Sequence, residues 1–348
     1  MDYCAPWWLP GGNLQTIWAA LRGLRYQSTK PVFRRERWAT PDQDFVDVDW
    51  LTDGSDANAN ADTKTEAKTQ PLLVVFHGLE GSSSSHYAEA LADVAKSRGW
   101  ACAVPHFRGC SGEMNLAPRA YHSGDFAEID WMLRRFKAMH EGPLLAVGIS
   151  MGGNALMRWA SEFEDMAADV VSAITSVCSP LDLTASGRAI GEGFNRQTYT
   201  RMFLGTLVPK ALQKLTQHPQ LFNREALLAA RDLYAFDNIF TAPLHGFKDT
   251  EDYWRRASAK PHMQRIAVPA LALNALNDPF VPSSSLPGKG DVSASVTLWQ
   301  PRQGGHVGFP GDSAAGWPQA HVRAMPMAVC EFLAQYLPSS ARGLKTHG

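Results

Sequence analysis

The sequence predicts an α/β protein with a mostly parallel central sheet and helices on both of its faces. From residue 71 onward, short and fully apolar runs alternate with stretches whose apolar residues recur at helical spacing. Fully apolar runs are typical of parallel strands buried on both faces, and their alternation with helices is typical of α/β folds. One long interruption of this order predicts a helical insertion.

The N-terminal region precedes the alternation. Residues 1–40 carry a cluster of large apolar side chains, which predicts an arm packed on the core, with an interfacial membrane anchor as the alternative. Residues 45–51 alternate apolar and polar, which predicts a half-buried strand. Residues 52–70 are polar and low in complexity, so we expect a mobile surface loop there.

The regular part of the chain follows. Its fully apolar runs predict buried strands at residues 72–76, 101–105, 144–148, 173–177 and 269–276. Amphipathic stretches between the first four runs predict helices at residues 87–96, 125–140 and 153–163. A strand at residues 296–299 and a helix around residues 324–336 complete the order.

Residues 183–262 interrupt this order with helical patterns and no clear buried strand. A connection of about eighty residues is long for a compact domain, and loops at the carboxyl ends of parallel strands are where such sheets carry function. We therefore expect a helical cap at 183–262 on a core formed by residues 41–182 and 263–348. Apolar candidates for the walls of its pocket are Phe194, Met202, Phe203, Leu204 and Leu207.

Composition excludes several classes of function. The net charge is -1, so no basic excess is available to bind nucleic acid. The five cysteines are widely spaced without a C-x-x-C pair, which favours reduced thiols in a cytoplasmic protein. The first residues lack the basic and apolar segments of a signal peptide, and no apolar run reaches membrane-spanning length, so we expect neither a signal peptide nor a transmembrane segment. Without an H-E-x-x-H, G-K-[ST] or G-x-G-x-x-G motif, we expect neither a metal nor a cofactor.

A short glycine-rich motif marks the candidate nucleophile. Residues 148–152 read G-x-S-x-G with Ser150 at the centre, directly after a predicted strand and before a predicted helix. This is the strand-turn-helix context of a nucleophile elbow, in which the flanking residues must be almost without side chains. The structural alternative is a glycine-rich turn around a buried serine.

A serine nucleophile needs a base, and the base needs an orienting acid. In hydrolases with this elbow the chain order is serine, acid, histidine. His306 lies in a glycine-rich loop after the strand predicted at residues 296–299 and is the candidate base. Asp278 follows the strand predicted at residues 269–276 and is the candidate acid, with Asp182 as the alternative.

The oxyanion hole is expected to combine two backbone N–H groups, those of Leu79 and Met151. Leu79 belongs to the loop His77-Gly78-Leu79, directly after the strand predicted at residues 72–76. Gly78 allows a close approach of the backbone, and we expect His77 to hold this loop rather than to act as a base.

Together these motifs resemble the YheT-type branch of the α/β-hydrolases, which are esterases related to the eukaryotic α/β-hydrolase-domain lipases. The resemblance spans nearly the whole chain and rests on LPGGNLQT at 9–16, HGLEG at 77–81, FRGCSG at 107–112, YHSG at 121–124, GISMGGN at 148–154 and NDP at 277–279. It implies the α/β-hydrolase fold, carboxylic ester hydrolysis and triad positions for Ser150, Asp278 and His306. Asn13 replaces a histidine that is frequent in relatives, and Asp125 departs from the His-x4-Asp acyltransferase pattern.

The predicted function is therefore that of a serine carboxylic ester hydrolase that works through an acyl-enzyme. We expect small-molecule substrates with short- to medium-length acyl chains, with monoacylglycerols among the candidates. A non-catalytic ligand-binding protein on the same fold and an acyltransferase are the alternatives.

Overall fold

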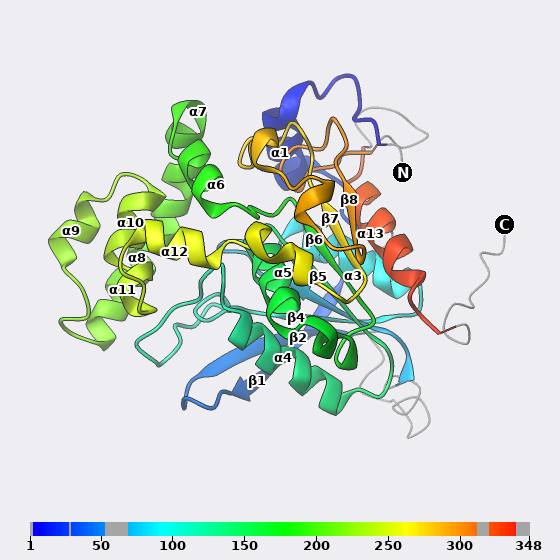
Figure 1. Cartoon of the computed structure of the whole chain (residues 1–348), viewed down its shortest axis with the longest axis horizontal. Helices are drawn as coiled ribbons and strands as arrows, with labels where there is room; N and C mark the ends of the chain where they lie inside the picture. The colour runs from blue at the N-terminus through cyan, green and yellow to red at the C-terminus, as the bar shows by residue number, and fades with distance from the viewer. Residues whose placement is uncertain (1–2, 28, 53–68, 312–319, 339–348) are drawn as a thin grey trace.

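The computed structural model describes residues 3–27, 29–52, 69–311 and 320–338. An eight-stranded sheet runs through the molecule with helices on both faces (Figure 1), which confirms the predicted α/β class. The strand order is β1-β2-β4-β3-β5-β6-β7-β8, and all neighbours from β4 to β8 are parallel. The predicted loop at residues 52–70 lies, from 53 to 68, outside the described residues.

The central strands form where the sequence has its apolar runs. Their bounds are β3 (Leu72–Phe76), β4 (Ala101–Pro105), β5 (Leu144–Ile149), β6 (Ala173–Val177), β7 (Ala270–Leu273) and β8 (Val296–Trp299). All five residues of β3 are buried because both faces of the sheet are covered. Strand β7 is shorter than the predicted strand at residues 269–276, and the chain turns at residues 276–277.

Two antiparallel strands extend one edge of the sheet. Strand β1 (Val32–Ala39) pairs with β2 (Phe45–Thr52), which in turn pairs with β4. The sequence prediction had included residues 32–39 in the N-terminal arm, and the structure instead places them in the sheet. Before them, the N-terminal region forms the helix α1 (Gly11–Arg22).

Two apolar layers cover the sheet. Alternate residues of β3 point to opposite faces, so that Val74 packs with helices α4 and α5 while Val75 packs with α3 and α13. The bounds of these helices are α3 (His86–Ser97), α4 (Phe126–Met139), α5 (Met151–Phe163) and α13 (Ala324–Ala334). The short helix η2 (Glu164–Asp169) follows α5.

Between β6 and β7 the chain builds a separate group of helices, drawn in green to yellow in Figure 1. They are α6 (Leu183–Ile190), α7 (Gly193–Asn195), η3 (Arg196–Thr200), α8 (Arg201–Gln217), α9 (Arg224–Ala229), α10 (Leu233–Ile239), α11 (Thr241–Leu244) and α12 (Thr250–Ala257). Helices α8 to α11 share an apolar cluster of their own, which includes Ala211, Leu227 and Phe236. After α12 the chain returns to the sheet through η4 (Lys260–Arg265), whose Met263 is fully buried in the core.

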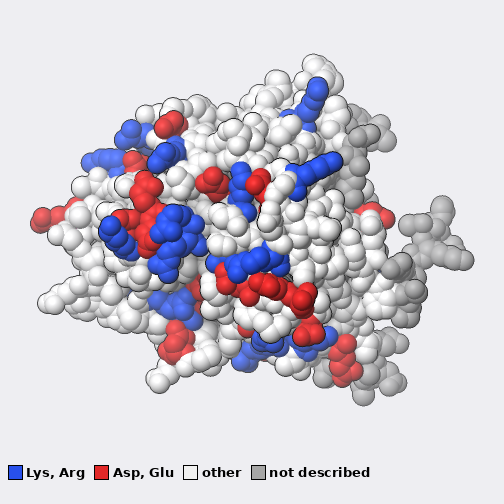
Figure 2. All heavy atoms as spheres, in the orientation of Figure 1, with Lys and Arg blue, Asp and Glu red and all other residues white. Residues whose placement is uncertain are grey.

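Charges of both signs are interspersed over the face shown in Figure 2. Arg255 and Arg256, for example, both pair with Asp252 on α12. Among the described residues, no helix combines the length and the apolar character needed to cross a membrane.

Candidate active site

Ser150 occupies the sharp turn between β5 and α5. Its φ of 53° and ψ of −120° lie in a region that residues other than glycine rarely adopt. The turn is possible because the residues two positions before and after Ser150 are glycines. A Cβ atom on Gly148 would lie 2.4 Å from the Cα of Gly153, and one on Gly152 would lie 2.5 Å from the carbonyl oxygen of His77. The backbone N–H of Ser150 donates to the carbonyl of Val177 at 2.8 Å, which ties the turn to β6.

His306 joins the serine to the predicted acid. Its Nε2 lies 3.0 Å from the Oγ of Ser150, and its Nδ1 lies 2.9 Å from Oδ2 of Asp278. The ring of Phe280 lies against the imidazole with centroids 4.2 Å apart. The structure thus brings the three predicted residues into one hydrogen-bonded chain, the arrangement needed to move a proton from a hydroxyl to an imidazole.

The carboxylate of Asp278 is held by backbone donors. Its side chain has no exposed surface, and its Oδ1 accepts hydrogen bonds from the N–H groups of Phe280 at 2.8 Å and Val281 at 3.3 Å. Asp182, the alternative acid, is engaged elsewhere, because its carboxylate accepts from the N–H of Ala185 and caps α6.

Leu79 and Met151, the residues expected to form the oxyanion hole, line the same cavity as Ser150. A Cβ atom on Gly78 would lie 3.2 Å from the Cβ of Ser150, so that only glycine brings this loop so close to the serine. Neither the N–H of Leu79 nor that of Met151 has an acceptor among the residues that the structure describes. Both are therefore available to a ligand oxygen.

The oxyanion loop is fixed by His77. Its Nδ1–H donates to the carbonyl of Gly78 at 2.7 Å, and its Nε2 accepts the N–H of Phe107 at 3.0 Å. Burial, with a smaller effect of His106, lowers the pKa of His77 to about 3, so the ring stays neutral and can keep this acceptor. His77 holds the loop, as the sequence predicted.

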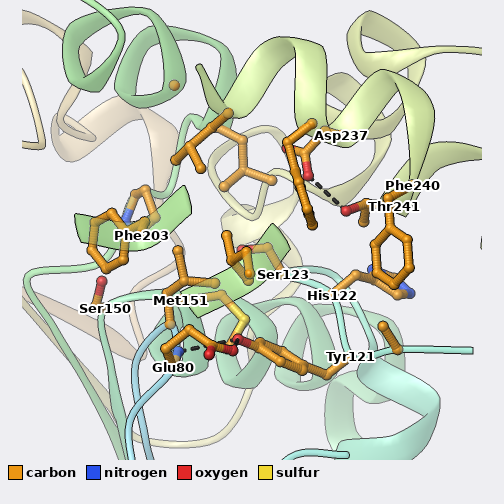
Figure 3. A pocket seen from close by; sticks show the side chains of 18 of the residues that line it. Glu80, Tyr121, His122, Ser123, Ser150, Met151, Phe203, Asp237, Phe240 and Thr241 are labelled. Carbon is orange, nitrogen blue, oxygen red and sulfur yellow. Dashed lines mark hydrogen bonds between the residues drawn. The ribbon is translucent and has the colours of Figure 1, made fainter. Parts of the chain in front are cut away.

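A cavity opens from Ser150 between the sheet and the helices that follow β6. Its volume is about 160 Å³. Figure 3 shows Met151, Phe203 and Ser123 near the serine, and Phe240 and Thr241 at the far end. The remaining apolar lining includes Leu79, Met114, Leu183, Ile190, Leu207, Phe236, Trp254, Phe280 and Val281.

The predicted pocket residues have three different positions, and only two of the five line the cavity. Phe203 and Leu207 line the cavity, and Leu204 packs in the cluster between α8 and α11. Phe194 and Met202 do not line it: they are 55% and 56% exposed, respectively, which corrects that expectation. Both residues lie on the side of the helical segments α7, η3 and early α8 that faces solvent. The sequence pattern did not show which side of these segments faces solvent.

The cavity wall also contains polar side chains, which the sequence pattern did not predict. Glu80 accepts the hydroxyl of Tyr121 at 2.8 Å and pairs with Lys210 of α8 at 2.8 Å. Asp237 accepts from Thr241 at 2.7 Å and from the indole N–H of Trp254 at 2.9 Å. Burial raises the pKa of Asp237 to about 6, although both hydrogen bonds oppose the shift.

Three side chains at the site are of the types that commonly bind metal ions in proteins. The Sγ of Cys178 and the ligand atoms of Asp278 and His306 lie within 4.8 Å of one another. Burial raises the pKa of the Cys178 thiol well above its usual range, whereas a cysteine ligand must be a thiolate. Both ring nitrogens of His306 are also engaged, with Ser150 and Asp278. The arrangement fits a hydrogen-bonded triad better than a metal site.

Comparisons with known proteins identify the family of this chain. Residues 71–312 match the family described as the alpha/beta hydrolase fold. The chain is 39% identical to "Putative esterase YheT" of Escherichia coli K12 over 79% of this chain and 78% of that protein. It is 26% identical to phospholipase ABHD3 of Homo sapiens over 87% of this chain and 72% of that protein.

A solved structure has the same fold. Est1E from Butyrivibrio proteoclasticus with bound ferulic acid superposes with a TM-score of 0.51 at 14% identity, over 86% of this chain and 98% of that chain. The chain therefore belongs to the α/β-hydrolase family, in its YheT-type branch.

Proposed function

We propose that this α/β-hydrolase is a serine carboxylic ester hydrolase that works through an acyl-enzyme on Ser150. The observation that carries the proposal is the chain of hydrogen bonds from Ser150 through His306 to Asp278. In the first step, Oγ of Ser150 attacks the ester carbonyl while Nε2 of His306 takes the hydroxyl proton. The imidazolium then gives this proton to the departing alkoxide, which leaves as the alcohol.

Hydrolysis of the acyl-enzyme repeats these steps with water. His306 accepts a proton from water as its oxygen attacks the acyl carbonyl, and returns that proton to Oγ of Ser150 when the carboxylic acid leaves. In both steps the backbone N–H groups of Leu79 and Met151 would stabilise the negative oxygen, because both residues line the cavity at Ser150 and neither N–H has an acceptor among the described residues. Asp278 would keep the imidazole oriented and stabilise its positive charge.

The cavity supports acyl esters as the substrate class. Its walls near Ser150 are apolar, including Phe203, Leu207 and Ile190, and apolar walls gain free energy from each methylene that they remove from water. We infer short- to medium-length acyl chains, with monoacylglycerols among the candidates. The names of the relatives, an esterase and a phospholipase, support ester bonds as targets.

The helices between β6 and β7 would act as a cap in this function, since α6, α8 and α10 to α12 supply much of the cavity wall.

We assign the enzyme to the cytoplasm, because Cys102, Cys110, Cys178 and Cys330 are buried free thiols, as is common in a reducing compartment.

A fluorophosphonate probe tests the proposal, because it reacts with activated serines. We expect the probe to modify Ser150 in the wild-type protein and to leave folded Ser150→Ala unmodified. Labelling of wild type should also slow in the presence of a hydrolysable ester such as p-nitrophenyl butyrate. A folded wild-type protein that does not react would instead favour the non-catalytic binding protein. Transfer of the acyl group to an added alcohol faster than to water would favour the acyltransferase.

A further inference from the structure

The loop that carries His306 has an unusual backbone. Between residues 304 and 309, positive φ angles occur at Gly304 (150°), Gly305 (61°), Val307 (57°) and Phe309 (39°). A positive φ is a strained conformation for a β-branched or aromatic residue. Such conformations persist only where the surrounding structure imposes them. The contacts of this loop therefore identify what holds His306 in place.

Helix α1 hydrogen-bonds to this loop and to the acid loop, which are also joined directly by a hydrogen bond from the N–H of Gly305 to Oδ1 of Asn277 at 3.0 Å. The hydroxyl of Thr16 accepts the backbone N–H of His306 at 2.8 Å and donates to the carbonyl of Gly12 at 2.7 Å. The side-chain oxygen of Gln15 accepts the N–H of Gly304 at 2.9 Å and the side-chain N–H of Asn277 at 3.0 Å. Gln15 is fully buried. One turn of α1 thus binds the backbone of the base and the residue before the acid.

The helix also packs against both loops through glycines. A Cβ atom on Gly12 would lie 1.8 Å from the carbonyl oxygen of Asn277. A Cβ atom on Gly305 would lie 2.6 Å from the carbonyl oxygen of Gly12, and one on Gly308 would lie 2.4 Å from that of Gln15. The backbone of α1 is therefore in close contact with the backbone of both loops. This leaves α1 little room to shift relative to His306 and Asp278.

We propose that Gln15 and Thr16 are positioning residues of the active site, through which α1 sets the distance and angle between His306, Asp278 and Ser150. The inference rests on the proposed function and deepens it. Neither residue would touch the substrate. Thr16 fixes the backbone of the base directly, and Gln15 fixes the loops of base and acid relative to each other. A displacement of about 1 Å in such a triad is enough to lower the rate by about 10²-fold.

Thr16→Val in the full chain tests the proposal, because valine keeps the shape and removes the acceptor. We expect kcat for p-nitrophenyl butyrate and the rate of fluorophosphonate labelling to fall by about 10- to 100-fold, with KM within about twofold of wild type. Thr16→Ser retains the hydroxyl and should keep most of kcat. Leu21→Ala is the matched control on the same helix, since Leu21 is 71% exposed, and should leave kcat unchanged.

The outcomes separate this inference from the proposed function. A wild-type protein that neither reacts with the probe nor hydrolyses esters contradicts the proposed function. An active wild type with an equally active Thr16→Val overturns the positioning role, as does an equal loss in Thr16→Val and folded Thr16→Ser. Should Thr16→Val fail to fold, Gln15→Met decides: it removes the acceptor for Gly304 and Asn277, and an unchanged kcat would likewise overturn the inference.

Discussion

Ser150, Asp278 and His306 follow three different strands, β5, β7 and β8, and their side chains meet because parallel strands end at the same edge of a sheet. Each carries a local pattern that the sequence displays, namely an elbow, a strand end and a glycine-rich loop. Gln15 and Thr16 belong to the LPGGNLQT motif, but that motif does not show which residues they bind. Their partners lie 289 and 290 residues away, so only the folded chain brings them to the site.

The role of Asp278 can be separated from that of Asp182. Asp278→Asn should lower kcat by about 10³- to 10⁴-fold at neutral pH, because an amide cannot stabilise the imidazolium of His306 and favours the wrong tautomer. Asp182→Asn should leave kcat near wild type, since that side chain caps α6. The measurement is ester hydrolysis by both purified variants side by side. The reverse ranking would assign the acid to the end of β6.

The bounds of some strands were predicted correctly from the sequence, whereas strand β1 was not predicted. Strands β3, β4 and β6 have the predicted bounds because each is a short and mostly apolar run, although β6 includes Thr175 and Ser176. Strand β1 was missed because half of its eight side chains are charged and five of the eight are exposed, as is common on a sheet edge. Two of its arginines pair with carboxylates of β2: Arg35 lies opposite Asp49 and Arg37 opposite Asp47, with ion pairs of 2.8 and 2.7 Å.

Packing between the helices that follow β6 leaves no space for a side chain at one glycine and leaves space for one at another. A Cβ atom on Gly187 of α6 would lie 2.4 Å from the ring of Trp254 on α12, whereas nothing in the described structure lies within 4 Å of one on Gly205 of α8. Gly187→Ala should therefore destabilise the protein by about 1–3 kcal/mol. Gly205→Ala should stabilise it by about 1 kcal/mol, because alanine favours helix. Chemical denaturation measures both, and an equal effect of the two substitutions would contradict this packing.

Asp237 joins α10 to α11 and α12 and makes their stability depend on pH. Its pKa is raised to about 6 by burial, so its contribution to stability is present below pH 4 and is lost as the pH rises through 6. Asp237→Asn does not ionise. We therefore expect the Tm of this variant, relative to wild type at the same pH, to increase from pH 4 to pH 7. A difference in Tm that stays constant over this range would show that Asp237 does not titrate there.

In the whole molecule, the site lies between the central sheet and the helices that follow β6, and these two parts contribute different groups to it. The sheet side supplies the reactive groups on rigid turns, and the helices after β6 supply apolar walls. The order of strands and helices made both parts predictable from the sequence. Which side chains of the helices face the cavity depends on how α6 to α12 pack on one another, which their individual patterns do not determine.

Neighbouring residues on α8 test the role of these walls. Phe203 lines the cavity, and Met202 is 56% exposed. Each methylene buried along the wall should contribute up to about 0.8 kcal/mol, so kcat/KM should rise from acetate to hexanoate esters. Phe203→Ala should lower the hexanoate-to-acetate ratio several-fold, and Met202→Ala should leave it unchanged. Equal ratios in both variants and wild type would exclude α8 from chain-length selection.

The central claim is that the hydroxyl of Ser150 forms the acyl-enzyme. Its most direct test is the steady-state rate of p-nitrophenyl butyrate hydrolysis by Ser150→Ala, with folding verified by circular dichroism. Removal of a triad serine should lower kcat by about 10⁴- to 10⁶-fold. A folded Ser150→Ala protein that retains a tenth of the wild-type rate would contradict the assignment.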